Sequence, residues 1–377
     1  MSAPFRTPFD IPDDLAYLNC AYLSPLMGSV VAAGRSAVLR KAHPWNILHK
    51  DFFDEVETLR GLFAKLIGAR ADDVAIVPSS AYGIATAAAN IPLAAGDNIV
   101  VPLAEHASTF HRWRVAAADS AADLREAAPK EGQDWADAIV ARIDERTRVV
   151  SVPNVHWSDG RLFDLDRIGS AARKIGAAFV VDGTQSVGAL PLSVETLQPD
   201  FLTCSAYKWL FCPYGFGFLY VAPRRQGGRP FEEHYFHRSG AAEHEGRLDQ
   251  LNAYDTGARR FDTAERASFI NVAMSVVALQ QLLDWSADGI RQQIAPVADA
   301  IIDGAKAHGY RAIESRQRAV HLFGLRRDGG LPQTLSQALQ AANVFVSIRG
   351  DAIRVSPHVY NTQADVDRFI GVLKVAN

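Results

Sequence analysis

Short runs of apolar residues alternate with longer amphipathic segments along most of the chain. Amphipathic periodicity predicts helices, including those over 81–90 and 165–175. The apolar runs predict strands at 74–77, 98–101, 149–152, 178–182, 201–205 and 217–221. Strands that alternate with helices are typical of an α/β fold with a mainly parallel central sheet, whose functional loops follow the carboxyl ends of the strands.

The pattern changes after a long helix predicted over 267–283. Helices predicted at 290–308, 332–342 and 363–375 then alternate with strands at 320–325, 344–348 and 352–355, which predicts a smaller α+β domain. We therefore expect a large domain over 26–265 and a small C-terminal domain over 266–377 that begins with the long connecting helix. Residues 1–25 are too apolar for a disordered tail, and we expect them to pack near the active site. The stretch 226–260 predicts a long surface excursion.

Composition excludes several classes of protein. The chain of 377 residues has a formal net charge of −3, which argues against nucleic acid or an anionic membrane as partner. Its 3 cysteines form no CxxC pair, so we expect neither a disulfide framework nor a metal site. Residues 1–6 lack the apolar stretch of a signal peptide, and no apolar run of about 18 residues exists. These features predict a soluble, cytoplasmic protein.

Two of the apolar runs end in residues of complementary chemistry, Asp182 after 178–181 and Lys208 after 201–205. Two adjacent parallel strands would bring this carboxylate and this amine to one edge of the sheet. The pair suits pyridoxal 5'-phosphate: the amine forms a Schiff base with the aldehyde, and the carboxylate keeps the pyridinium nitrogen protonated. We predict both residues to be catalytic and to bind this cofactor. The alternatives are a surface lysine and an aspartate that caps a turn.

Other polar residues near the predicted strand ends could hold the rest of the cofactor. Gln185 and Asn154 could each reach its phenolate oxygen, and the ring of His106 could stack on the pyridine as a further catalytic residue. The segment 78–84 follows a strand and opens a helix, so its N-terminus favours a phosphate. The residues expected at that phosphate are Ser80, which is equally plausible as an N-cap, Ala81, Tyr82, Ser205 and Tyr207.

Substrate contacts are predicted from two parts of the chain. Arg354 lies inside an apolar strand, where a guanidinium is costly unless it is paired. A substrate carboxylate would be a bidentate partner, and an internal salt bridge is the alternative. In the N-terminal segment we expect Asn19 and Tyr22 to bind substrate. Further candidates for the pocket are His156, Trp157 and His358.

The motifs "VVDGTQSVG", "SAYKWLFCPYGFGFLYV", "LAEH" and "IRVSPHVYNTQADVDRFI" resemble those of class V aminotransferases, which are fold-type I pyridoxal phosphate enzymes. This family includes cysteine desulfurases, kynureninase and isopenicillin N epimerase-like proteins. The resemblance implies a homodimer with active sites at the subunit interface. It also implies the roles already given to Lys208, Asp182, Gln185, His106 and Arg354, with Ser205 as a phosphate ligand.

Two departures from the desulfurase pattern bear on the reaction. Desulfurases carry a nucleophilic cysteine just before the carboxylate arginine, whereas 349–353 contains no cysteine, so a thiol-dependent desulfurase is not expected. Cys20 in the N-terminal segment could approach the site. Desulfurases also have a Gly-Thr pair that reaches the partner subunit's phosphate where this chain has Ala264-Glu265. Arg266 or Ser268 could take over that contact.

These observations predict an enzyme that acts on an α-amino acid through an external aldimine, in the manner of a class V aminotransferase. Lyase chemistry at Cβ–S or Cβ–C and epimerisation stay open on the same scaffold, because all three begin with removal of the α-proton. A catalytically inactive protein that binds the cofactor is an alternative of another class. A nucleotide-binding site is disfavoured, because 215–217 precedes a predicted strand instead of following one.

Overall fold

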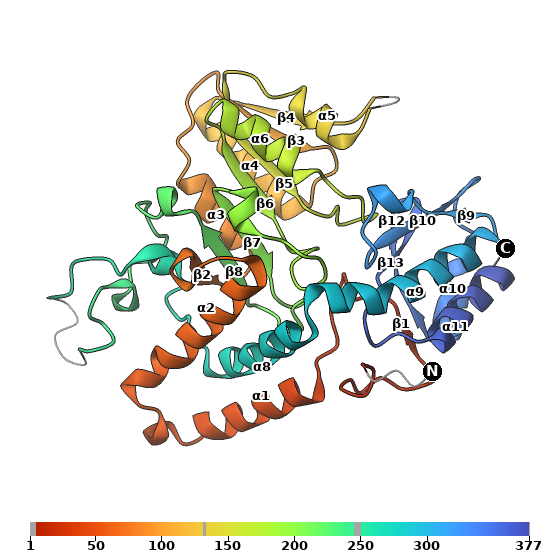
Figure 1. Ribbon diagram of the computed structural model, residues 1–377, viewed down its shortest axis with the longest axis horizontal. Helices are drawn as coiled ribbons and strands as arrows, with labels where there is room; N and C mark the ends of the chain where they lie inside the picture. The colour runs from red at the N-terminus through yellow and green to blue at the C-terminus, as the bar shows by residue number, and fades with distance from the viewer. Residues whose placement is uncertain (1–4, 131–132, 245–249, 377) are drawn as a thin grey trace.

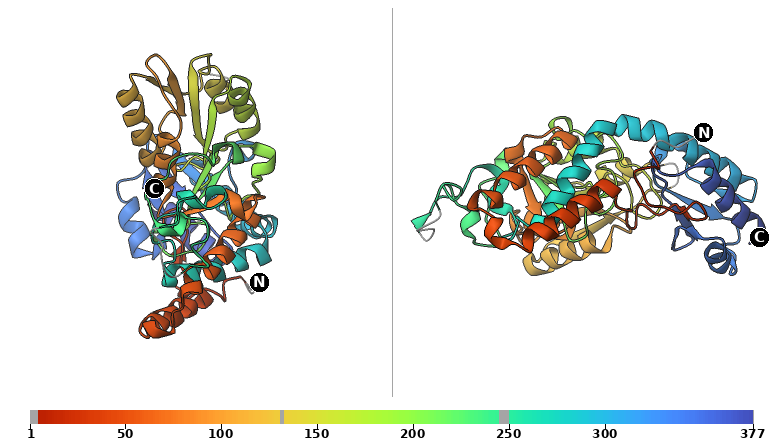
Figure 2. Two further views of the ribbon diagram at one scale, coloured as in Figure 1. Left: turned by 90° about the vertical axis from the view of Figure 1, so that its left-hand side faces the viewer. Right: turned by 90° about the horizontal axis from the view of Figure 1, so that it is seen from below.

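The structure, a computed structural model, describes residues 5–130, 133–244 and 250–376. Residues 1–4 of the predicted N-terminal segment, 245–249 of the predicted surface excursion and 377 lie outside the described residues. A larger body contains a seven-stranded sheet and a smaller body a four-stranded sheet, and the long helix α9 (Ala287–Lys306) leads from one to the other (Figures 1 and 2).

The larger sheet has the strand order β2-β8-β7-β6-β5-β3-β4. Its strands are β2 (Val74–Val77), β3 (Asn98–Pro102), β4 (Asp123–Ala127), β5 (Thr147–Pro153), β6 (Ala178–Asp182), β7 (Phe201–Ser205) and β8 (Gly217–Val221). β8 runs antiparallel to both of its neighbours, and the other pairs are parallel. The predicted α/β fold with a mainly parallel sheet is therefore confirmed. The edge strand β4 was missed because its charged, partly exposed residues lack the apolar run of a central strand.

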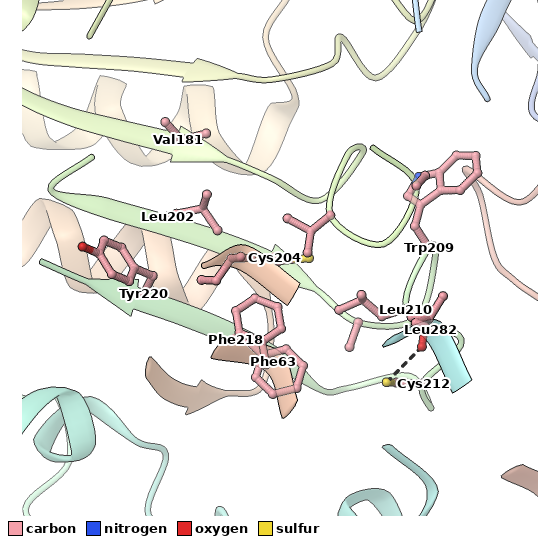
Figure 3. Close-up of a cluster of buried hydrophobic side chains, with 14 of the residues drawn as sticks. Phe63, Val181, Leu202, Cys204, Trp209, Leu210, Cys212, Phe218, Tyr220 and Leu282 are labelled. Atoms are coloured by element: carbon pink, nitrogen blue, oxygen red, sulfur yellow. Dashed lines mark hydrogen bonds between the residues drawn. The ribbon is translucent and has the colours of Figure 1, made fainter. Parts of the chain in front are cut away.

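Both faces of this sheet are covered, and every residue of β2, β3, β7 and β8 is buried. The helices of the larger body are α1 (Gly28–Lys41), α2 (Asp54–Ile67), α3 (Ser80–Ala89), α4 (Ala107–Ser120), α5 (Trp135–Val140), α6 (Leu165–Lys174), α7 (Val194–Leu197) and α8 (Phe269–Trp285). Phe63 of α2 stacks on Phe218 of β8 with ring centroids 4.1 Å apart, in a core that also contains Cys204 and Cys212 (Figure 3). This packing supports the edge of the sheet on which the cavity described below opens.

The smaller body has an antiparallel sheet of order β12-β13-β10-β9. Its elements are β9 (Tyr310–Arg311), β10 (Phe323–Arg327), α10 (Leu335–Ala341), β12 (Ser347–Arg349), β13 (Ala352–Val355) and α11 (Gln363–Val375). The N-terminal strand β1 (Ala16–Tyr17) pairs with β11 (Val344–Phe345), so the predicted strand 344–348 is divided between two sheets. The N-terminal segment thus packs on the C-terminal part of the chain.

The domain limits at 25/26 and 265/266 stay predictions. Helix α8, expected to begin the small domain, packs against α1 and α2 of the larger body. Within the described ranges, we find no helix with the length and apolar character needed to cross a membrane.

Candidate active site

The carboxyl ends of β2, β3, β5, β6 and β7 open on one cavity of about 280 Å³, which we call the inner compartment. It adjoins a cavity of about 450 Å³, the outer compartment, which the N-terminal segment and the β12–β13 hairpin complete. The residues that line both are His106, Trp157, Gln185, Tyr207, Lys208 and Tyr214. The two compartments therefore form one site, with the Lys208 side chain at their junction.

Lys208 and Asp182 lie together in the inner compartment, as their places after β7 and β6 predict. Lys208 is 9% exposed, and burial lowers the pKa of its amine to about 8 against the opposing attraction of Asp182. Asp182 accepts a hydrogen bond through Oδ1 from the backbone N–H of Thr184 at 2.8 Å, which orients the carboxylate. A neutral amine is a nucleophile, so this lysine is suited to covalent attachment of an aldehyde.

A corner for an anion forms where α3 begins beside β7. The Ser80 N–H donates to Ser205 Oγ at 3.0 Å, and Ser205 Oγ donates to Ser80 Oγ at 3.0 Å. A Cβ on Gly83 would come within 2.3 Å of Thr203 Oγ1, so only glycine lets α3 approach β7 this closely. Two hydroxyls and a helix N-terminus in one corner fit a phosphate group.

The local details at this helix differ from expectation at two residues. Its N-cap is Ser79 instead of Ser80, because Ser79 Oγ accepts from the Tyr82 N–H at 3.2 Å. Ser80 and Ala81 line the inner compartment, but Tyr82 does not. The Tyr82 hydroxyl donates to Glu232 Oε1 at 2.9 Å instead, on the outer side of the helix.

His106 lines both compartments, and the loop before it is tightly held. His106 is the N-cap of α4. The rings of His106 and Trp157 pack edge to face with their centroids 5.7 Å apart. Ala104 has a φ of 59°, a left-handed backbone conformation that costs an alanine conformational free energy. The Ala104 carbonyl accepts a hydrogen bond from Trp157 Nε1 at 3.0 Å, which helps to hold the loop in this conformation. Burial lowers the pKa of His106, so a neutral ring is available for stacking.

Glu105 is a functional candidate that the sequence analysis missed. Its side chain lines the inner compartment, and the residue is 7% exposed. Oε1 accepts from the His106 N–H at 2.6 Å, whereas the buried Oε2 has no hydrogen-bond partner. Burial raises the pKa of Glu105 to about 8, and nearby Asp182 adds to the shift. A charged residue so soon after the buried strand β3 was the signal that could have found it.

Of the two amides expected at the phenolate oxygen, the structure brings only Gln185 into the site. Its Oε1 accepts from Trp209 Nε1 at 2.8 Å, and its Nε2 donates to the Ala21 carbonyl at 3.3 Å. Asn154 lines a neighbouring cavity, whereas Pro153 faces the inner compartment. Side chains alternate along an extended chain, so adjacent residues at the end of β5 point to opposite sides.

Arg354 of β13 lines the outer compartment, as its predicted contact with substrate requires. It is 3% exposed and donates through Nη1 to the Trp157 carbonyl at 2.9 Å and through Nη2 to Ser347 Oγ at 3.3 Å. Its Nε is buried without a partner. Among the described residues, no carboxylate forms an ion pair with it, so the structure offers no support for the internal salt bridge considered as an alternative.

The remaining candidates for the pocket divide into two groups. Tyr22 lines the outer compartment, and Trp157 lines both. Asn19 does not line the outer compartment. Its Oδ1 accepts a hydrogen bond from Ser347 Oγ at 2.9 Å, and the same Ser347 Oγ accepts from Arg354, so the serine connects Asn19 to Arg354.

Two histidines lie outside both compartments. His156 Nε2 pairs with the Ala104 carbonyl at 3.1 Å, and its Nδ1 pairs with Ser158 Oγ at 2.9 Å. His358 is fully buried against Trp209 and Phe211.

The cysteines are core residues. Cys20, Cys204 and Cys212 are at most 2% exposed, and none lines either compartment. Cys20 Sγ lies 3.8 Å from the Lys208 carbonyl, and burial raises the pKa of its thiol. These thiols are therefore poor nucleophiles at neutral pH. Within the described ranges, no group of three or more His, Cys, Asp or Glu residues could hold a metal ion.

Arg266 and Ser268, suggested for a contact with a partner subunit's phosphate, line neither compartment of their own subunit, and that suggestion stays a prediction. Arg266 is 2% exposed, packs on the rings of Phe53 and Phe236, and pairs through Nε with Asp262 Oδ2 at 3.1 Å. Ser268 lines a separate surface cavity. The structure thus gives Arg266 a structural partner inside its own subunit.

Comparisons with known proteins agree with this geometry. The family model described as "Aminotransferase class-V" matches residues 30–369. An uncharacterized aminotransferase, YcbU, of Bacillus subtilis strain 168 is 28% identical over 342 residues, which is 89% of this chain and 86% of the relative. A cysteine desulfurase of Enterobacter sp. strain 638 is 27% identical over 386 residues, with 96% and 93% covered. A mutant of C-DES with glycine covalently linked to its pyridoxal phosphate cofactor superposes with a TM-score of 0.87 at 19% identity, covering 95% of this chain and 96% of that one.

The match to the class V aminotransferase model and the fold define a fold-type I enzyme that depends on pyridoxal phosphate. The donors present fit this cofactor: an amine, a carboxylate and an anion corner line one inner compartment. The chain belongs to the class V aminotransferase family, as its resemblance in sequence predicted.

Proposed function

We propose that this enzyme removes the α-proton of an amino acid, with Lys208 as the base, and transfers the amino group in the manner of an aminotransferase. The observation that carries the proposal is the position of Lys208 at the junction of the two compartments, with a pKa of about 8. An amine with that pKa exchanges protons readily near neutral pH.

The other residues would hold cofactor and substrate in place around this amine. Ser80 and Ser205 would bind the phosphate, and Asp182 would hold a proton on the pyridine nitrogen. Arg354 would bind the substrate carboxylate through a guanidinium that has no ion-pair partner among the described residues. When bound, pyridoxal phosphate supplies a ring that withdraws electron density from the α-carbon of the substrate.

Elimination at the β-carbon, such as Cβ–S lysis, is the second candidate. Desulfurase relatives favour it, and no cysteine of the described ranges lines the site. A lyase that releases sulfur directly needs no thiol, whereas a desulfurase that stores sulfur on a cysteine does. Sulfur transfer through a protein thiol is therefore not proposed.

We also propose that the enzyme is a homodimer. Large apolar side chains are exposed at and near the mouth of the site, with Tyr214 at 73%, Tyr22 at 58% and Leu103 at 47%. Burial of such residues against a second copy would exclude water from the site. A cytoplasmic location stays a prediction.

Borohydride trapping tests the proposal. In protein saturated with pyridoxal phosphate, peptide mapping should find the label on Lys208 and lose it in Lys208→Ala. A panel of amino acids should then change the cofactor absorbance, with a keto acid as product of transamination, or pyruvate and sulfide from a thiol-containing amino acid in the case of a lyase. Label on another lysine, or no spectral response to any amino acid, would refute the proposed function.

A further inference from the structure

The outer compartment has a marked excess of positive charge. Arg349, Arg354 and Lys208 line it, and none of the aspartates and glutamates in the part of the chain that the structure describes does. The carboxylates of the site, Asp182 and Glu105, line only the inner compartment. The outer compartment is therefore a place for anions.

The register of one hairpin brings the two arginines together. β12 and β13 are antiparallel, with Ser347 opposite Arg354 and Arg349 opposite Ala352. Residues two apart on a strand share a face, and directly paired residues share it too. Arg349 and Arg354 therefore lie on the same face of the hairpin, whose turn begins at Gly350 with a φ of 59°.

Neither guanidinium has a carboxylate partner among the described residues. Arg354 uses two of its nitrogens on neutral oxygens, and its Nε is buried without a partner. The Nε of Arg349 is likewise buried and unpartnered. Burial lowers the pKa of Arg354 to about 10, and the charge of Arg349 is the next largest cause. A buried cation beside a partly buried one is costly when no described residue supplies a counter-ion, so the compartment is built for a ligand that brings the missing charge.

A neutral amino acid supplies only one anionic group to these two arginines. We propose that the preferred substrate is an amino acid whose side chain ends in a carboxylate or a comparable oxyanion, with Arg354 on the α-carboxylate and Arg349 on the side-chain anion. This inference depends on the proposed function, because it assigns the substrate class of the same site. The alternative, in which both arginines share one carboxylate, is an outcome of the test below.

Inert anions separate this question from catalysis. Calorimetry on the protein loaded with pyridoxal phosphate would compare succinate and glutarate with propionate and butyrate. For whichever of the two dicarboxylates binds more tightly, the Kd of the wild type should be about tenfold to about 100-fold lower than that for the matching monocarboxylate. This ratio is what one additional charge-assisted hydrogen-bonded pair contributes. Arg349→Gln should bring that ratio close to one, and Arg349→Lys should retain part of it. Arg311→Gln is the control, because Arg311 of β9 belongs to the same sheet but lies outside the compartment and is 65% exposed.

Turnover gives a second reading. The ratio of kcat/KM for L-aspartate or L-glutamate to that for L-alanine should fall in Arg349→Gln by a similar factor. A ratio of dicarboxylate to monocarboxylate affinity near one in the wild type would overturn the inference. So would equal weakening of both classes in Arg349→Gln, which would show a shared carboxylate. If the affinity ratio is as expected but no amino acid alters the cofactor absorbance, the proposed function fails and the anion site stands.

Discussion

Two groups of arginines, whose guanidinium groups are fully or partly buried, differ in whether a carboxylate balances their charge. Arg60 of α2 is fully buried and forms a bidentate pair with the fully buried Asp262, at 3.0 and 2.8 Å. Arg354 is almost as buried, yet it and Arg349 have no carboxylate partner among the described residues. The first group lies in the larger body and the second at the outer compartment.

The main partner of Arg60, Asp262, comes from a distant part of the chain. Arg60 also donates to the Val74 carbonyl and to Glu57 Oε1, and Asp262 Oδ1 accepts from the Ile76 N–H at 2.8 Å. This network ties α2 and β2 to the segment before α8, so its charges are balanced by the protein itself. The contrast teaches that a balanced buried charge is part of the framework, whereas an unbalanced one marks a place for a ligand.

Removing the counter-ion of the balanced group should have the largest effect. In Asp262→Asn, Arg60 and Arg266 lose their shared carboxylate, so the free energy of unfolding should fall by about 3–5 kcal/mol. Denaturant titration at neutral pH measures it. Glu314→Gln, which breaks an exposed pair with Arg316, is the control and should change stability by at most about 1 kcal/mol. If Asp262→Asn lowers the free energy of unfolding no more than the control does, the distinction between balanced and unbalanced buried charges is wrong.

Glu105 sharpens the comparison, because it is an unbalanced buried acid. Its pKa of about 8 lies above the unfolded value of about 4.3, so between these values the folded state binds more protons. Stability should therefore fall as pH rises through this window. Glu105→Gln has no buried carboxyl that must ionise at high pH. It should therefore be more stable than the wild type at pH of about 9 by on the order of 2 kcal/mol, with little difference at pH of about 4. Parallel stability curves for the two proteins would contradict this assignment.

Arg354→Met should have the smallest effect on stability, opposite in sign to that of Asp262→Asn. Without ligand, replacing an unpaired buried cation by an apolar side chain should leave stability unchanged or raise it by about 1 kcal/mol. Thermal unfolding of the cofactor-loaded protein measures this. Succinate should raise the Tm of the wild type but not that of the variant. A destabilisation as large as that of Asp262→Asn would show that Arg354 is a structural residue.

The parts of the site that could be predicted are those that depend on where buried strands end. Asp182 and Ser205 close β6 and β7 at the predicted residues, because parallel buried strands are continuous apolar runs with sharp polar ends. Asn154 shows the limit of this reasoning, since one residue beyond the end of a strand faces the other side. The unexpected structural role of Arg266 depends on Asp262 and on two aromatic rings, one of them far from it in the chain.

The sequence by itself determined the α/β order and the cofactor, and it singled out the lysine and the aspartate that we propose to serve that cofactor, because these follow from local runs of side chains and from the chemistry of single residues. Only the tertiary structure decided which charges are balanced. That property depends on which side chains meet across distant segments. Arg60 pairs with Asp262, whereas Arg354 donates to two neutral oxygens, and neither it nor Arg349 has a carboxylate partner among the described residues. Coulomb energy in a buried site depends on these distances, and the order of residues does not contain them.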